Sequence, residues 1–82
     1  IVEIKAKPKM EDIEKHIKRI HIYCREYKKR TKDKRKVIGA IAGAIFPSKE
    51  KAATLEAGLF VITQNGDTVK IDIPENFKPR IF

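Results

Sequence analysis

The feature that most restricts the fold is an uninterrupted apolar run, VIGAIAGAIF, over residues 37–46 of a highly charged chain. Lys, Arg, Asp and Glu make up 37% of the 82 residues, so a stretch this long without any of them is expected to be buried. As a strand it would be apolar on both faces, which is typical of a parallel sheet covered by helices. Its small residues would let helices approach closely.

A helix is the alternative for this run, because the spacing of Gly39 and Gly43 also suits a helix-packing face. The length of the run and the proline at position 47 favour the strand. The run is about half the roughly 20 residues that a membrane-spanning helix needs, so no membrane partner is expected.

A long amphipathic helix is predicted before this run, over residues 10–29. Its apolar side chains fall within an arc of about 100°, as expected for a helix packed on a core. They are Met10, Ile13, Ile17, Ile20, Cys24 and Tyr27. Acidic residues in the first turns and basic residues at the end match the helix macrodipole.

His16 and His21 are five residues apart on this helix, which separates them by about 140° around the axis. They cannot share a metal ion as an i, i+4 pair can, and both are expected at the flanks of the helix. Ile22 points away from the apolar stripe, which suits either a second contact or an isolated exposed side chain.

The first six residues read as a strand with alternating faces. Val2, Ile4 and Ala6 share one face, and Glu3 and Lys5 share the other. Because the chain opens directly on this strand with Ile rather than Met, we expect that a neighbouring strand is missing.

Turn signals predict the remaining elements. Ser48 is expected to cap a short helix over residues 49–57, with Gly58 as its left-handed C-terminal residue. A strand over residues 59–63 follows.

The Asn65-Gly66 pair then predicts a hairpin to an antiparallel strand over residues 68–73. Alternation in that strand places Val69, Ile71 and Ile73 inward, and the tail after Pro74 is expected to be irregular.

The order strand, helix, strand, helix, hairpin predicts one α/β domain over residues 1–82 with a mixed sheet. Its first two strands should be parallel, with a right-handed crossover and helices covering the sheet.

Positive charge is concentrated in one part of the chain. Residues 9–36 carry a net charge of +7 of the total +8, with twelve Lys and Arg against five Asp and Glu. Its densest part is Lys28, Lys29, Arg30, Lys32, Lys34, Arg35 and Lys36. Such a density predicts a nucleic-acid partner, DNA rather than RNA, although a solvated helix end also carries bases.

Other features restrict the chemistry and the compartment. A single cysteine, Cys24, excludes an intramolecular disulfide and fits the reducing cytoplasm. Abundant Lys and Glu with few Asn, Gln, Cys and Met are typical of thermophile proteins. The absence of glycine-rich phosphate loops, of G-x-S-x-G and of CxxC argues against nucleophilic catalysis.

The segments GAIAGAI (residues 39–45), GLFVI (58–62), NGDTVKI (65–71) and FKPR (77–80), together with Glu3-Ile4-Lys5, resemble the PD-(D/E)xK nuclease-like superfamily. They are similar to the C-terminal end of uncharacterised archaeal and cyanobacterial members. The resemblance covers most of the chain and implies a restriction-endonuclease-like core fragment, the C-terminal portion of a longer protein.

The resemblance also implies site residues. Glu3 would bind Mg²⁺ or Mn²⁺, the main-chain carbonyl of Ile4 would add a ligand, and Lys5 would position the attacking water. Oxygen ligands suit Mg²⁺, which lowers the pKa of bound water. The superfamily's other aspartate would precede Ile1, so this chain alone is expected to have weak or no activity.

Two alternatives remain open. The chain could be a binding or assembly module that uses its basic segment for nucleic acid, or the edge of the strand at residues 1–6 for a second copy of itself. It could also be a plain soluble domain whose charge reflects heat adaptation.

Overall fold

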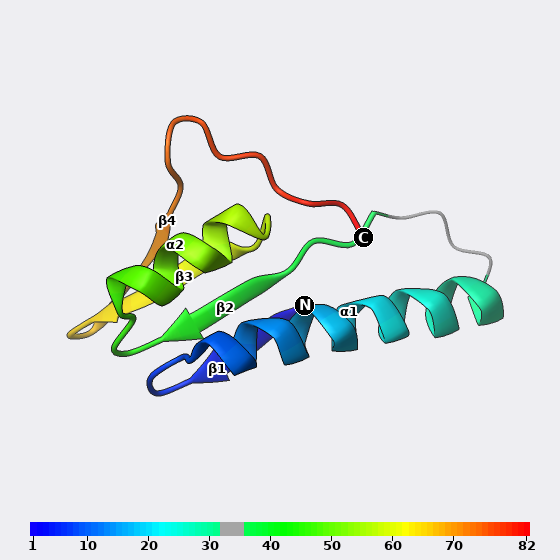
Figure 1. Ribbon diagram of the computed structural model, residues 1–82, viewed down its shortest axis with the longest axis horizontal. Coiled ribbons are helices and arrows are strands. Elements are labelled where there is room, and N and C mark those ends of the chain that lie inside the picture. Colours follow the sequence, from blue (N-terminus) through cyan, green and yellow to red (C-terminus); the bar gives the residue numbers. More distant parts are fainter. Residues whose placement is uncertain (32–35) are drawn as a thin grey trace.

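The computed structural model describes residues 1–31 and 36–82 (Figure 1). Its elements are β1 (Val2–Lys5), α1 (Met10–Thr31), β2 (Ala40–Gly43), α2 (Ser48–Glu56), β3 (Phe60–Asn65) and β4 (Thr68–Asp72). The four strands form one sheet in the order β1-β2-β3-β4. The β1–β2 and β2–β3 pairs are parallel and the β3–β4 pair is antiparallel. These observations confirm the predicted α/β architecture with a mixed sheet.

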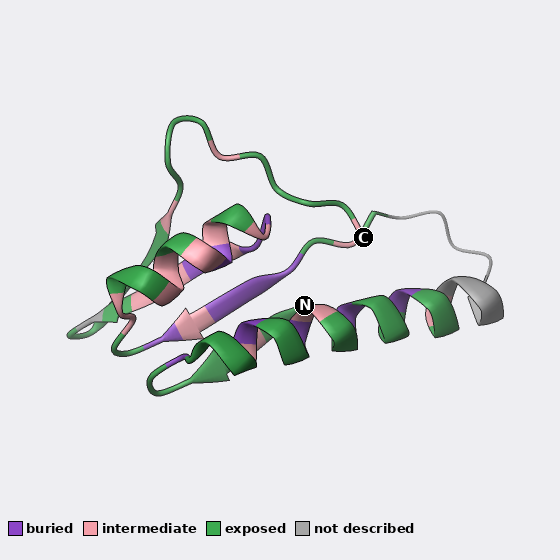
Figure 2. Cartoon of the chain, viewed as in Figure 1, coloured by how far each residue is buried: buried purple, intermediate pink, exposed green. Residues whose placement is uncertain are grey.

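Both helices pack against the same face of the sheet. Ile13 and Ile20 of α1 meet Ile41 of β2 and Leu59 in one buried cluster. Ala53 of α2 packs against the same cluster, and burial follows β2 and the inner side of both helices (Figure 2). The sheet therefore has one covered face, which carries the core, and one open face.

Close approach of α1 to the chain just before β2 depends on a residue without a side chain. A Cβ atom at Gly39 would lie 2.5 Å from Cδ1 of Ile20 and 2.8 Å from Cδ2 of Leu59. Such distances are shorter than any van der Waals contact allows. The prediction that small residues in this run admit a helix is confirmed on the covered face.

The prediction that the run over residues 37–46 is buried on both faces is wrong in part. The strand itself is short, and Ile38 and Ile45 just outside it are 46% and 63% exposed. Within residues 1–31 and 36–82 no helix lies over the open face, because α1 and α2 share a single core on the other side.

The inward orientation predicted for Val69, Ile71 and Ile73 is wrong. These side chains are 69%, 54% and 60% exposed. Ile71 is aligned with Ile62 of β3, and neighbouring positions on β3 and β4 alternate between the two faces. The apolar side of β4 therefore belongs to the open face.

The short helix and the hairpin differ in detail from their predictions. The N-cap of α2 is Pro47, without a side-chain hydrogen bond, so the predicted Ser48 cap is wrong. Gly58 and Gly66 have φ angles of 81° and 64°, which L residues rarely adopt. Asn65 pairs with Thr68, so the hairpin turn consists of Gly66 and Asp67.

The tail after β4 has no regular secondary structure, as predicted, and its end lies beside Val37, which precedes β2. The ring of Phe77 lies 5.0 Å from that of Phe60, edge to face. The backbone N–H of Phe82 donates to the carbonyl oxygen of Val37 at 2.9 Å, and the Phe82 side chain packs against the core.

Candidate functional site

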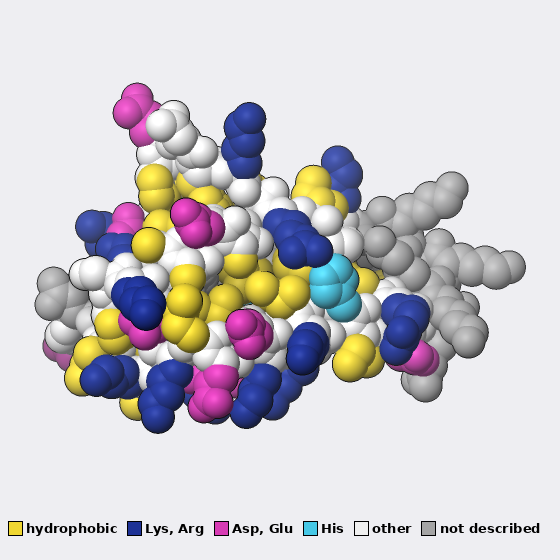
Figure 3. Space-filling model, viewed as in Figure 1, with side chains coloured by type: hydrophobic (Ala, Val, Ile, Leu, Met, Phe, Trp, Pro, Cys, Tyr) yellow, Lys and Arg dark blue, Asp and Glu magenta, His cyan; other side chains and the backbone are white. Residues whose placement is uncertain are grey.

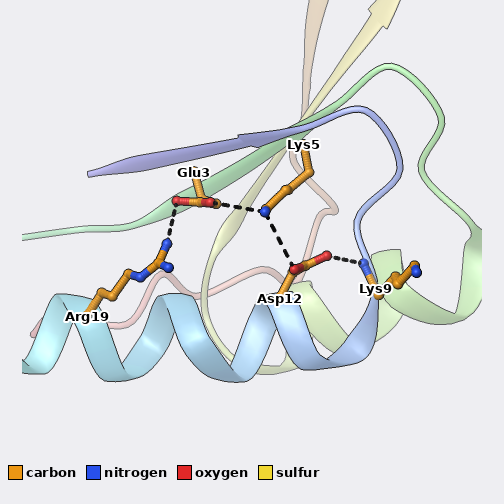
Figure 4. Close-up of polar contacts among 5 residues, drawn as sticks. All are labelled: Glu3, Lys5, Lys9, Asp12 and Arg19. Carbon is orange, nitrogen blue, oxygen red and sulfur yellow. Dashed lines mark hydrogen bonds and ion pairs between the residues drawn. The ribbon is translucent and has the colours of Figure 1, made fainter.

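Glu3 and Lys5 lie on the covered face of the sheet and point toward α1 (Figure 4). Lys5 Nζ is 3.9 Å from Glu3 Oε1 and 3.9 Å from Asp12 Oδ1. Arg19 Nη1 donates to Glu3 Oε2 at 3.3 Å. We call these four residues, Glu3, Lys5, Asp12 and Arg19, the β1–α1 charge cluster.

The first turn of α1 fixes the position of Asp12. The backbone N–H of Lys9, the residue before the helix, donates to Asp12 Oδ2 at 2.9 Å. The backbone N–H of Asp12 in turn donates to the carbonyl oxygen of Lys9 at 3.0 Å. The bond from Lys9 N–H to the Asp12 side chain is one half of a capping box, and it holds one carboxylate oxygen while the other faces Lys5.

The β1–α1 charge cluster is half-buried and carries two carboxylates. The side chains of Glu3 and Asp12 are 22% and 14% exposed, against 45% for Lys5. Glu3 and Lys5 are thus brought together as predicted. Asp12 is a member that the sequence analysis missed, because only the crossing of α1 over β1 brings it near Glu3.

Ile4 is separated from this cluster by the sheet. Its side chain lies on the open face and is 78% exposed, so only its main chain could serve the predicted role. Within residues 1–31 and 36–82, no group of three or more His, Cys, Asp or Glu is placed to hold a metal ion.

The predicted basic segment is described only in part. Lys28, Lys29 and Arg30 belong to the last turns of α1, and Lys36 is exposed before β2. Lys32, Lys34 and Arg35 lie outside the described residues.

The structure adds bases that the sequence analysis counted without assigning them to a site. Lys15, Lys18 and Arg25 are exposed and follow one another at helical spacing along the side of α1 away from the core. Basic side chains, with acidic ones between them, gather over α1 in Figure 3. The exposed basic surface therefore begins well before residue 28.

His16 is not at the flank of α1, and that prediction is wrong. Its side chain is 2% exposed, and its Nε2 lies 3.4 Å from the carbonyl oxygen of Ile1. The Nδ1 atom is buried without a hydrogen-bond partner among the described atoms. His16 lies three residues after Ile13 and four before Ile20, a spacing that places it beside the apolar stripe.

His21 is exposed and helps to attach the tail. Its ring lies 5.2 Å from that of Phe82, and its Nε2 is 3.0 Å from Arg80 Nη2. The Arg80 guanidinium also lies 4.8 Å from the centre of the Phe82 ring. His21 is thus part of a packing contact at the surface, whereas His16 is buried.

A second ion pair between helix and sheet joins Lys51 of α2 to Asp72 of β4. The hydrogen bond from Lys51 is the largest cause that lowers the pKa of Asp72 below its usual 3.8. Desolvation is the next-largest cause and raises this pKa, whereas the positive charges of Lys51 and then of Lys70 lower it further.

Comparison with family models, with curated proteins and with solved structures found no match for this chain. None of the described helices is both long enough and apolar enough to cross a membrane.

The lowered pKa of Asp72 predicts a loss of stability in acid. Because the pKa of Asp72 is lower in the folded state, its ion pair stabilises the fold fully above the unfolded-state pKa of 3.8. This stabilisation is lost as the pH falls through the pKa of the folded state. We expect Asp72→Asn to lower the thermal unfolding midpoint at pH 7, and the difference from wild type to shrink below pH 3.8. A difference of the same size at every pH, measured by circular dichroism, would contradict this assignment.

Proposed function

We propose that this chain is a nucleic-acid-binding domain that holds phosphates with the outer side of α1 and the basic segment that follows it. The observation that carries the proposal is the placement of charge. Residues 9–36 carry +7 of the net +8, and three of their described exposed bases, Lys15, Lys18 and Arg25, share the side of α1 that faces away from the core.

The shape of α1 suits a long polyanion. Its 22 residues span about 33 Å at about 1.5 Å each, which is close to one turn of a DNA duplex. The four-residue strands β1 and β2 are only about 13 Å long, so α1 extends beyond the sheet (Figure 1). A cationic rod that projects from its domain can reach phosphates without a clash from the sheet.

Phosphate contacts of this kind give affinity without sequence readout, and they depend on salt because counterions are released. We propose DNA as the main partner, with RNA as the weaker one. A direct comparison of duplex DNA with duplex RNA of the same sequence tests this preference.

Replacing Lys15, Lys18 and Arg25 together by Gln should weaken binding to duplex DNA. Each lost phosphate contact lowers the slope of log K against log salt by about 0.9, so the slope should fall by up to about 2.7. Fluorescence anisotropy at several salt concentrations measures both effects.

The matched control is the triple variant Lys49→Gln, Lys70→Gln and Lys78→Gln, which removes the same charge from exposed positions on α2, β4 and the tail. Equal loss of affinity and slope in both triple variants would show that only net charge matters, and the assignment to α1 would fail.

We propose metal-dependent cleavage of nucleic acid as a second candidate function, within a restriction-endonuclease-like core. The specific observation in its favour is the β1–α1 charge cluster, in which Asp12 supplies a second carboxylate beside Glu3 and Lys5. One or two carboxylates together with substrate phosphates are a usual donor set for Mg²⁺.

On this proposal Glu3, Asp12 and the main-chain carbonyl of Ile4 hold Mg²⁺ or Mn²⁺. The bound ion would lower the pKa of a coordinated water and stabilise charge on the phosphate. Lys5 would supply a compact positive charge beside that water. Because Lys5 Nζ lies between the two carboxylates, the ion competes with this ammonium for the same oxygens.

This second candidate predicts that Mn²⁺ binds to the chain and that Glu3→Gln and Asp12→Asn each abolish the binding, measured by isothermal titration calorimetry. Weak cleavage of DNA with Mn²⁺ should disappear in Lys5→Ala, while Lys78→Ala, at an exposed position on the tail, should keep it. Cleavage that survives Lys5→Ala, or an absence of Mn²⁺ binding, would rule this function out.

A further inference from the structure

The open face of the sheet carries no charged side chain on any described strand. Its outward positions are Val2, Ile4, Ala40, Ala42, Phe60, Ile62, Gln64, Val69 and Ile71, as the strand register requires. The strand register places the four charged residues of β1 and β4 on the covered face instead. They are Glu3, Lys5, Lys70 and Asp72. In a chain that is 37% charged, this distribution marks the open face as a surface that is kept from water.

The open face is uneven: it is low over β2 and raised over β4 and over β1, where Val2 and Ile4 are 52% and 78% exposed. The β2 positions are Ala40 and Ala42, whereas Val69 and Ile71 on β4 are 69% and 54% exposed. Two hollows of about 310 and 380 Å³ lie on this face, lined respectively by Ala40 and by Ala42 with Ala44, and Ile62 of β3 borders both. The branched side chains of β4 thus form a ridge on one side of β3, and the alanines of β2 form a trough on its other side.

We propose that the open face binds the open face of a second copy of this chain. β2 and β4 lie on either side of β3, each about 4.8 Å away. A two-fold axis along β3 therefore places the β4 ridge of each copy over the β2 trough of the other. The surface is complementary to itself, which is the requirement for a symmetric dimer.

Electrostatics favours this arrangement over other ways of joining two chains of charge +8. Facing sheets pack about 10 Å apart, and each helix layer lies about 10 Å further out, so the two cationic helix layers are about 30 Å apart. That distance is about three Debye lengths in 0.1 M salt, so the repulsion between them is screened. Contact through the helix layers would instead bring the like charges together.

The size of the face makes the dimer weak and reversible. Four strands about 4.8 Å apart and about 17 Å long give a projected area of about 330 Å². Stable complexes bury about 800 Å² of accessible surface on each partner. The dimer therefore dissociates on dilution, and sedimentation velocity from about 10 µM to about 1 mM should follow the change.

The test uses Ile71→Lys on β4 and Ile4→Lys on β1, with Ile22→Lys on α1 as the matched control. Ile22 is 52% exposed against 54% for Ile71, so the same substitution is made at the same exposure on opposite sides of the molecule. Ile71→Lys should weaken association at least about tenfold, because it buries an unpaired ammonium over β2 of the partner. Ile4→Lys lies at the outer edge of the interface, since β1 is two strands from the axis, and should weaken association by a smaller but measurable factor. The control should associate as wild type, and higher salt should leave wild-type association unchanged or stronger.

Several outcomes would overturn the proposal. A wild-type chain that stays monomeric from about 10 µM to about 1 mM would exclude the dimer. Binding of an added amphipathic peptide to the open face, without self-association, would exclude it too. Dimers that survive both lysine variants would point to pairing along the β1 edge, and dimers that weaken with salt would point to ion pairs. Ile4 is 78% exposed, so Ile4→Lys keeps the test decisive if Ile71→Lys unfolds.

Discussion

The contact of α1 with Gly39, the residue before β2, is the constraint on which the rest of the structure depends. Ile20 and Leu59 occupy the space that a side chain at Gly39 would fill, and both are completely buried. A chain of this size has a small core, so the single cluster around Ile41 has to hold both helices and the sheet together. Both helices are thereby committed to one face of the sheet, and the other face is left open.

This one-sided packing explains where charge and apolar surface lie. The edge strands β1 and β4 lie beneath the flanks of the helices, where long charged side chains can reach partners on α1 and α2. Their apolar side chains consequently point to the open face. The cationic outer side of α1 and the charge-free open face are on opposite sides of the molecule, so a nucleic acid and a second copy of the chain could be bound together.

Much of the fold could be predicted from the sequence because its signals are local. The amphipathic stripe of α1, the apolar run of β2 and the glycines at positions 58 and 66 each determine an element or a turn without help from the rest of the chain. The covered face of each edge strand could not be predicted, because alternation separates two faces but does not say which one the helices cover. Val69, Ile71 and Ile73 were misplaced for this reason.

The candidate site was predictable to the same limited extent. Glu3 and Lys5 share a face through simple alternation, whereas Asp12 joins them only through the crossing of α1 over β1. His16 was placed at the flank because histidine was not counted with the apolar stripe, although its spacing from Ile13 and Ile20 fits burial. Which side chains of two different elements meet depends on tertiary packing. The periodicity of a single helix or strand carries no information about that packing.

A backbone-amide NMR titration of the chain with a short DNA duplex tests directly whether α1 binds phosphates. Shift changes are expected along α1, around Lys15, Lys18 and Arg25, while the amides of β4 stay unchanged. Added salt should reverse these changes, since they arise from phosphate contacts. Changes centred on β4 and the open face, or no changes at low salt, would contradict the proposed binding by α1.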